Sequence, residues 1–200
     1  MSRLKQIIFF YVYPMKNILA LLILIIPLIN GCKSTKPAVV PVRAVEQTPR
    51  PSVNFSEQST WLLGYFNREQ MSREPHSGWF IKGYDEYRFS SDAVNRLVEI
   101  PHDGLSIKVV LGTWCPDSRR EVPRFMRILD LWKFPMEKLT LIGVDDAKLS
   151  PVGEYEKLDI QRVPTFIIYK NNIEAGRIIE NPATSLEQDM VNILIRSDQK

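Results

Sequence analysis

The chemistry of this chain centres on one cysteine, which lies between an apolar run and a stretch with helical spacing, in the segment Trp114-Cys115-Pro116-Asp117-Ser118. A cysteine at a helix N-terminus faces unpaired backbone N–H groups and the positive end of the helix dipole, and both favour the nucleophilic thiolate. Arg119 and Arg120 would add positive charge beside it, whereas Asp117 opposes them. Pro116 suits the first helical turn, where its missing N–H is not needed. The pattern predicts a reactive thiol at Cys115.

The elements predicted around this segment would place Cys115 at the functional edge of a sheet. Apolar runs predict buried strands at 106–113, 139–144 and 164–169, and the turn at 171–172 leads into a hairpin partner around 176–179. An apolar stripe predicts a helix after Cys115, a short helix is expected at 154–158, and a last helix begins at Ser185. This order indicates an α/β sandwich with a mixed sheet, in which functional groups gather beyond the carboxyl ends of the parallel strands.

Several motifs together resemble those of the thioredoxin family. The segment from Trp114 resembles its Trp-Cys-x-x-Cys active site, Pro123 stands where the family has a helix-kinking proline, and Val163-Pro164-Thr165 matches its cis-proline loop. The likeness covers residues 104–197. It implies a thioredoxin-like three-layer α/β/α sandwich with a mixed sheet and an N-terminal extension. It also implies a cis bond before Pro164 and a substrate chain that pairs with the backbone at Val163, Pro164 and Thr165.

The chain departs from this family where the second cysteine of the motif would stand. Ser118 occupies that position, and Val109 stands where the family has a buried acid. A dithiol–disulfide cycle needs a resolving thiol on the same site, so ordinary disulfide reduction is not expected. A hydroxyl at Ser118 would only hydrogen-bond the thiolate of Cys115 and stabilise it.

Three interpretations of Cys115 follow from this departure. The preferred one is a single-thiol oxidoreductase that forms mixed disulfides and is released by an external thiol, in disulfide isomerisation or deglutathionylation. Its partners would be protein thiols or disulfides and a low-molecular-weight thiol. The alternatives are a non-redox module that holds a partner protein in the cis-proline groove, and an inert core cysteine. Peroxidase and copper-carrying variants of the fold are excluded, because the residues before Cys115 lack the peroxidase pattern and no second thiol accompanies it.

Residues 1–31 have the pattern of an export signal. Lys16 precedes an uninterrupted apolar run at 18–29, and the small residue Gly31 precedes Cys32. Residues 28–32 resemble the lipobox of bacterial lipoproteins, which implies a lipidated Cys32 at the mature N-terminus; Met15 is an alternative start. The competing interpretation, an uncleaved membrane anchor at 7–29, would place Lys16 near the middle of the bilayer at an energetic cost. Both place the rest of the chain outside the cytoplasm, in the bacterial cell envelope and attached to the membrane.

A tether and an N-terminal extension are predicted between the signal and the thioredoxin-like domain at 104–200. Residues 32–54 contain four prolines and few large apolar side chains, which favours an extended tether. Within the extension at 55–103, we predict a short helix at 61–66, an irregular or strand-like segment at 78–89, and a helix at 93–100 capped from Ser90. The extension is expected to cover an edge or one face of the core, with its aromatic side chains against the sheet.

Composition and charge exclude several classes of function. The 200 residues include 26 Lys+Arg and 23 Asp+Glu, but the surplus of positive charge lies entirely within 1–31, so nucleic acid is not an expected partner. Two cysteines exclude a disulfide-rich scaffold and a four-cysteine zinc site. His76 and His102 are expected to be solvated, and Asp145-Asp146 to cap the following segment rather than bind a metal. No cofactor, metal or nucleotide motif is expected.

Overall fold

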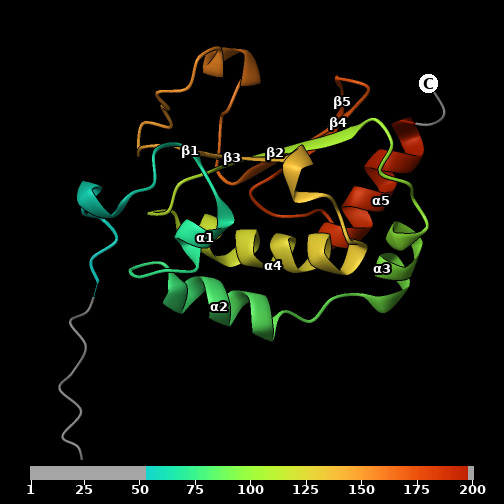
Figure 1. The fold of residues 1–200 in the computed structure, drawn as a ribbon, viewed down its shortest axis with the longest axis horizontal. Coiled ribbons are helices and arrows are strands. Elements are labelled where there is room, and N and C mark those ends of the chain that lie inside the picture. Colours follow the sequence, from blue (N-terminus) through green and yellow to red (C-terminus); the bar gives the residue numbers. More distant parts are fainter. Residues whose placement is uncertain (1–52, 198–200) are drawn as a thin grey trace, which may run out of the picture. The chain divides into compact units, whose positions relative to one another are not determined.

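The computed structural model of the chain describes residues 53–197, and a five-stranded sheet lies at its centre (Figure 1). The strand order is β1-β3-β2-β4-β5, with bounds Gly64–Phe66 (β1), Leu105–Leu111 (β2), Leu139–Gly143 (β3), Thr165–Lys170 (β4) and Ile173–Ile179 (β5). β2 and β3 are parallel, whereas β1 with β3, β2 with β4 and β4 with β5 are antiparallel. The sheet is therefore mixed, as predicted.

One face of this sheet carries the main core. Alternate side chains of β2, including Ile107 and Val109, pack there with those of α4 (Pro116–Trp132) and α5 (Leu186–Ser197). The apolar stripe predicted for the helix after Cys115 is buried, at Val122, Phe125, Met126, Leu129 and Trp132. α3 (Ser91–Val98) begins as predicted, since the Ser90 hydroxyl accepts a hydrogen bond from the Ala93 N–H at 3.4 Å.

The segment at 144–163 covers the opposite face of the sheet, where it is drawn in orange above the strands in Figure 1. Its helical part is the short 3₁₀ helix η3 (Tyr155–Leu158), which agrees with the short helix predicted there. A second, smaller core forms under it from Val110, Cys115, Ile142, Val144, Tyr155, Leu158, Val163 and Ile167. The sheet thus lies between two covering layers, which confirms a thioredoxin-like α/β sandwich.

Two secondary-structure predictions for the N-terminal extension were wrong. The segment 61–66 is not a helix: after η1 (Gln58–Thr60), residues 64–66 form the edge strand β1, which pairs with β3. The segment 78–89 is not irregular: α1 (Arg68–Met71) leads into α2 (Ser77–Glu86). Phe80, Tyr84 and Tyr87 recur at the spacing of one helical face. The segment forms a helix because this face packs against another element.

That partner is α4 rather than the sheet, which corrects the predicted packing of the aromatic side chains. Figure 1 shows α2 on the side of α4 that faces away from the strands. The two helices approach closely at Gly83, where an added Cβ would lie only 2.6 Å from Pro123 Cγ. The N-terminal extension therefore covers an edge of the sheet with β1 and the thiol-bearing helix with α2.

A charged cluster fastens this extension to α4. Arg68 donates two hydrogen bonds to the Asp130 carboxylate, at 2.8 and 2.7 Å, and the Tyr84 hydroxyl donates to the same carboxylate at 2.5 Å. Burial raises the pKa of Asp130, but the hydrogen bonds from Arg68 and Tyr84 outweigh it and lower that pKa overall. Asp130 is therefore held as an anion between α1, α2 and α4.

The predicted export signal, Cys32 and almost all of the tether lie outside the described residues. Within 53–197, no helix is both long and apolar enough to cross a membrane.

Candidate active site

Cys115 lies where the sequence predicts, at the junction of β2 and α4. It is the N-cap residue of α4, with Pro116 in the first turn, and its N–H donates to the Gly112 carbonyl at 2.9 Å. The residue is only 7% exposed, and Sγ donates a hydrogen bond to the Val163 carbonyl at 3.3 Å. The sulfur is thus held between the helix N-terminus and the loop before β4.

Ser118 is fully buried one turn into α4 and supports the loop rather than the sulfur. Its Oγ accepts a hydrogen bond from the Gly112 N–H at 3.3 Å. Among the hydrogen bonds of residues 53–197, none joins Ser118 to Cys115. Val109 is also fully buried, in the apolar core of β2, so it supplies no group that takes up a proton.

Trp114 packs beside the thiol with its indole donor already engaged. Nε1 donates to the Val144 carbonyl at 3.0 Å, and the ring lies 6.1 Å from that of Trp61, centroid to centroid. Trp61 Nε1 donates to the Phe55 carbonyl at 2.9 Å. Both tryptophans therefore present ring faces, not hydrogen-bond donors, to their surroundings.

Arg119 is the cation most closely linked to the thiol. Its guanidinium lies over the Phe55 ring, 4.4 Å from the centroid, and its Nη2 donates to the Trp114 carbonyl at 3.2 Å. Burial lowers the pKa of Arg119, and the interaction with Cys115 opposes that effect. Arg119 thus places a positive charge beside the Cys115 sulfur.

The acid that was expected to oppose this effect is neutralised by its own partners. Asp117 pairs with Arg120 at 2.7 Å, and Arg120 also pairs with Glu121 at 2.6 Å. Glu121 in turn binds Arg124 at 3.0 Å. The negative charge of Asp117 is therefore largely compensated, which leaves the charge of Arg119 to act on the sulfur.

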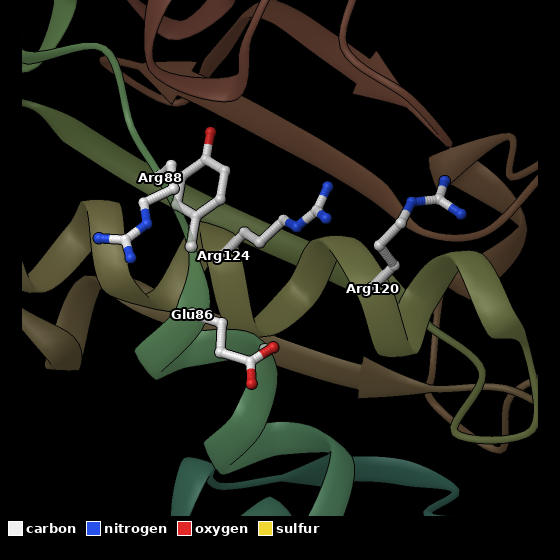
Figure 2. Close-up of a pocket in the computed structure, with 6 residues that line it drawn as sticks. Glu86, Arg88, Arg120 and Arg124 are labelled. Carbon is white, nitrogen blue, oxygen red and sulfur yellow. The ribbon is translucent and has the colours of Figure 1, made fainter.

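These ion pairs run along one side of a hollow of about 440 Å³ on α4. Figure 2 shows Arg120 and Arg124 on α4. Glu86, the last residue of α2, and Arg88, which follows that helix, lie nearby. Because Asp117, Glu121 and Glu86 offset the three arginines, this hollow carries little net charge.

The loop before β4 faces the thiol as the resemblance implies. The Val163–Pro164 peptide bond is cis. Val163 supplies the carbonyl that meets Sγ, the Pro164 carbonyl accepts from the Glu180 N–H at 2.7 Å, and Thr165 is already part of β4, paired with Val110 and Ile179. The structure thus brings Val163 and Pro164 to the site and places Thr165 within the sheet behind it.

Comparisons with known proteins add little to this geometry. No protein-family model matches the chain, and no curated protein is significantly similar to it in sequence. Among solved structures, a protein of unknown function from Pseudomonas aeruginosa has a TM-score of 0.46 at 14% identity, over 64% of this chain and 86% of its own. An HIV epitope-scaffold gives the same TM-score and identity, over 64% of this chain and 87% of its own. The function is therefore inferred from the site itself.

Sequence reasoning missed the part of the site that comes from the N-terminal arm, residues 53–62. The arm brings Phe55 to Arg119 and Trp61 to Trp114, and the Leu62 N–H donates to the Thr113 hydroxyl at 3.2 Å. The resemblance begins only at residue 104, so it gave no reason to look there. The aromatic residues of the arm were the available signal.

The two histidines are not solvated, which corrects that prediction. His76 is 2% exposed and packs against Phe55 and Trp79, with ring centroids 6.0 and 5.9 Å apart. His102 is partly buried against Trp132, 4.7 Å between centroids.

Asp145 acts as expected, since its Oδ1 accepts from the Leu149 N–H at 2.8 Å. No group of three metal-ligating side chains occurs within 53–197.

Proposed function

We propose that this chain is a membrane-tethered, extracytoplasmic thioredoxin-like protein that carries out thiol–disulfide exchange through Cys115. The observation that carries the proposal is the position of this thiol at the N-terminus of α4, beside a cis-proline loop and the charge of Arg119. A helix N-terminus and a nearby cation both favour the thiolate. Cys115 is the free cysteine of the described residues, so the site works with one sulfur.

Exchange at a single sulfur proceeds in two balanced steps. Cys115 first loses its proton, and the thiolate attacks one sulfur of a disulfide R–S–S–R′, which forms Cys115–S–S–R and expels R′–S⁻. An external thiolate then attacks the R sulfur, which forms a new disulfide and returns the Cys115 thiolate. The enzyme sulfur ends unchanged, so the net reaction exchanges disulfide partners, as in isomerisation or deglutathionylation. Ser118 has no sulfur with which to replace the external thiol.

The partners that suit this cycle are protein thiols or disulfides together with a low-molecular-weight thiol. The substrate chain would bind beside Val163 and Pro164, whose loop already contacts the sulfur. Lipidation at Cys32 would attach the protein to the membrane of the bacterial envelope, where disulfides persist.

One observation favours a second function, a non-redox module that binds a partner protein at the same groove. Cys115 is largely buried, and its Sγ donates a hydrogen bond to the Val163 carbonyl, so the protein itself already contacts the sulfur. Under this alternative the groove holds its partner without a covalent bond.

A mixed-disulfide assay separates the two functions. The chain carrying Cys32→Ser, so that Cys115 is its only thiol, is incubated with oxidised glutathione and examined by intact mass spectrometry. Exchange predicts one glutathione adduct that is lost on adding a thiol and is missing from the Cys115→Ser control. Absence of any adduct on the folded chain, together with partner binding that survives Cys115→Ser, would establish the non-redox module instead.

A further inference from the structure

A hollow of about 470 Å³ lies between the N-terminal arm and the active-site segment. Arm residues 53–56 line one part of it, Trp61 and Trp114 another, and Arg119 and Asp146 supply its charged side chains. Trp114 precedes Cys115 in the chain, and the Arg119 guanidinium interacts electrostatically with the Cys115 thiol, so the hollow adjoins the active-site segment. The inference drawn from it rests on the proposed thiol exchange and concerns the substrate of that reaction.

The walls of the hollow are aromatic and contribute no free donor from their indoles. Trp61 and Trp114 have both Nε1 atoms engaged with backbone carbonyls, at 2.9 and 3.0 Å. Phe55 is held in place by the guanidinium that lies over its ring. These rings offer contact area to the apolar part of a ligand, and its polar part must be recognised by another residue.

Arg119 is the residue that can recognise a polar group. Its Nε is buried and has no hydrogen-bond partner, and among residues 53–197 no carboxylate forms an ion pair with it. Its neighbour Arg120, by contrast, is paired with both Asp117 and Glu121. Asp146, the acid that lines the same hollow, is exposed, so water screens its charge. A partly buried guanidinium that pairs with no carboxylate of the described residues is complementary to an anion.

We infer that this hollow is a subsite for a carboxylate on the substrate, attached close to the sulfur that bonds to Cys115. The apolar atoms between carboxylate and sulfur would lie against Trp61 and Trp114, and the carboxylate would accept hydrogen bonds from Arg119. When the Cys115 thiolate attacks, two negative groups approach each other, and Arg119 reduces their repulsion. The substrate class is thus a carboxylate-bearing disulfide, from either a low-molecular-weight thiol or an acidic residue beside a protein cysteine.

Disulfides of matched size and different charge test this inference on the chain with Cys32→Ser. Dithiodipropionate is anionic, bis(hydroxyethyl) disulfide is neutral and cystamine is cationic. The measured quantity is the second-order rate of adduct formation on Cys115, expressed as the ratio of the anionic to the neutral disulfide. This ratio cancels any effect of a variant on the amount of thiolate.

We expect Arg119→Gln to lower this ratio about tenfold, which corresponds to the loss of one hydrogen bond to a charged group. Arg119→Lys keeps the charge but loses the planar fork, so an intermediate ratio is expected. Arg124→Gln removes the same charge from the same helix at a residue outside the hollow and should leave the ratio unchanged. Circular dichroism and urea titration establish that each variant is folded.

The outcomes separate the inference from the proposed function. If Cys115 reacts with all three disulfides and Arg119→Gln leaves the ratio unchanged, the carboxylate subsite is refuted and thiol exchange stands. If Cys115 in the folded chain reacts with none, the proposed function fails and the inference fails with it. Where the ratio does fall, the rates of oxidised glutathione and of a peptide disulfide with Asp or Asn beside its cysteine are measured in the same way. The substrate class whose rate depends on Arg119 is the source of the carboxylate.

Discussion

The contact between Gly83 and Pro123 is a sharp test of how the N-terminal extension is joined to the thiol-bearing helix. Replacing a glycine inside a helix by alanine normally stabilises it by about 0.5–1 kcal/mol. At Gly83, however, the new Cβ would meet Pro123 Cγ at 2.6 Å and Cβ at 3.2 Å, and a proline ring within α4 cannot turn aside. Overpacking of this kind costs about 1–3 kcal/mol. The net expectation for Gly83→Ala is a loss of about 1–2 kcal/mol, or roughly 3–6 °C in Tm.

Gly78 provides the matched control, because it lies in the same helix and a Cβ there meets no atom within 4 Å. Gly78→Ala should therefore leave the free energy of unfolding unchanged or raise it slightly. Urea titration of both variants, with the m-value compared to detect any loss of two-state behaviour, gives the two changes directly. A Gly83→Ala chain as stable as the Gly78→Ala chain would refute the close packing of α2 on α4.

Two further predictions concern the site and its surroundings. Ser118→Cys should create a dithiol that closes to an intramolecular disulfide with Cys115 and reduces insulin in the presence of dithiothreitol; a chain that folds but forms no such disulfide would contradict the thioredoxin-like geometry. Burial lowers the pKa of His76, the charge of Arg119 lowers it further, and Glu74 opposes them. As pH falls below about 6.5, the unfolded chain therefore takes up the proton first and the free energy of unfolding declines. His76→Gln should flatten this decline between pH 7 and pH 5 in urea titrations, and an equal slope in both chains would contradict a buried, neutral imidazole.

The parts of the fold that could be predicted are those whose signals are local. The apolar run of β2, the proline after Cys115 and the stripe on α4 are properties of short segments, and they place the thiol correctly. The cap of α3 at Ser90 and the hairpin of β4 and β5 are equally local.

The predictions that were wrong depend on partners far away in sequence. Residues 64–66 become a strand because β3 offers them an edge to pair with, and nothing within the segment indicates this. α2 is a helix because its aromatic face meets α4, and His76 is buried because Phe55 and Trp79 close over it. The N-terminal arm, residues 53–62, could not be placed at the candidate site because its contacts are also with residues far away in sequence.

The position of Trp114 has a practical consequence for following the reaction. An indole whose neighbour in the chain is the reacting sulfur is a built-in optical reporter, since disulfides quench tryptophan emission. Trp132 lies at the other end of α4, roughly 24 Å away for a helix of this length, and Trp79 packs within the α2 segment. Trp132 provides a constant background, whereas Trp79 contacts His76, which packs against Phe55 of the site. The emission of Trp114 and its neighbour Trp61 changes against this background when Cys115 acquires or loses a partner. The state of the sulfur can thus be read in real time without attaching a dye.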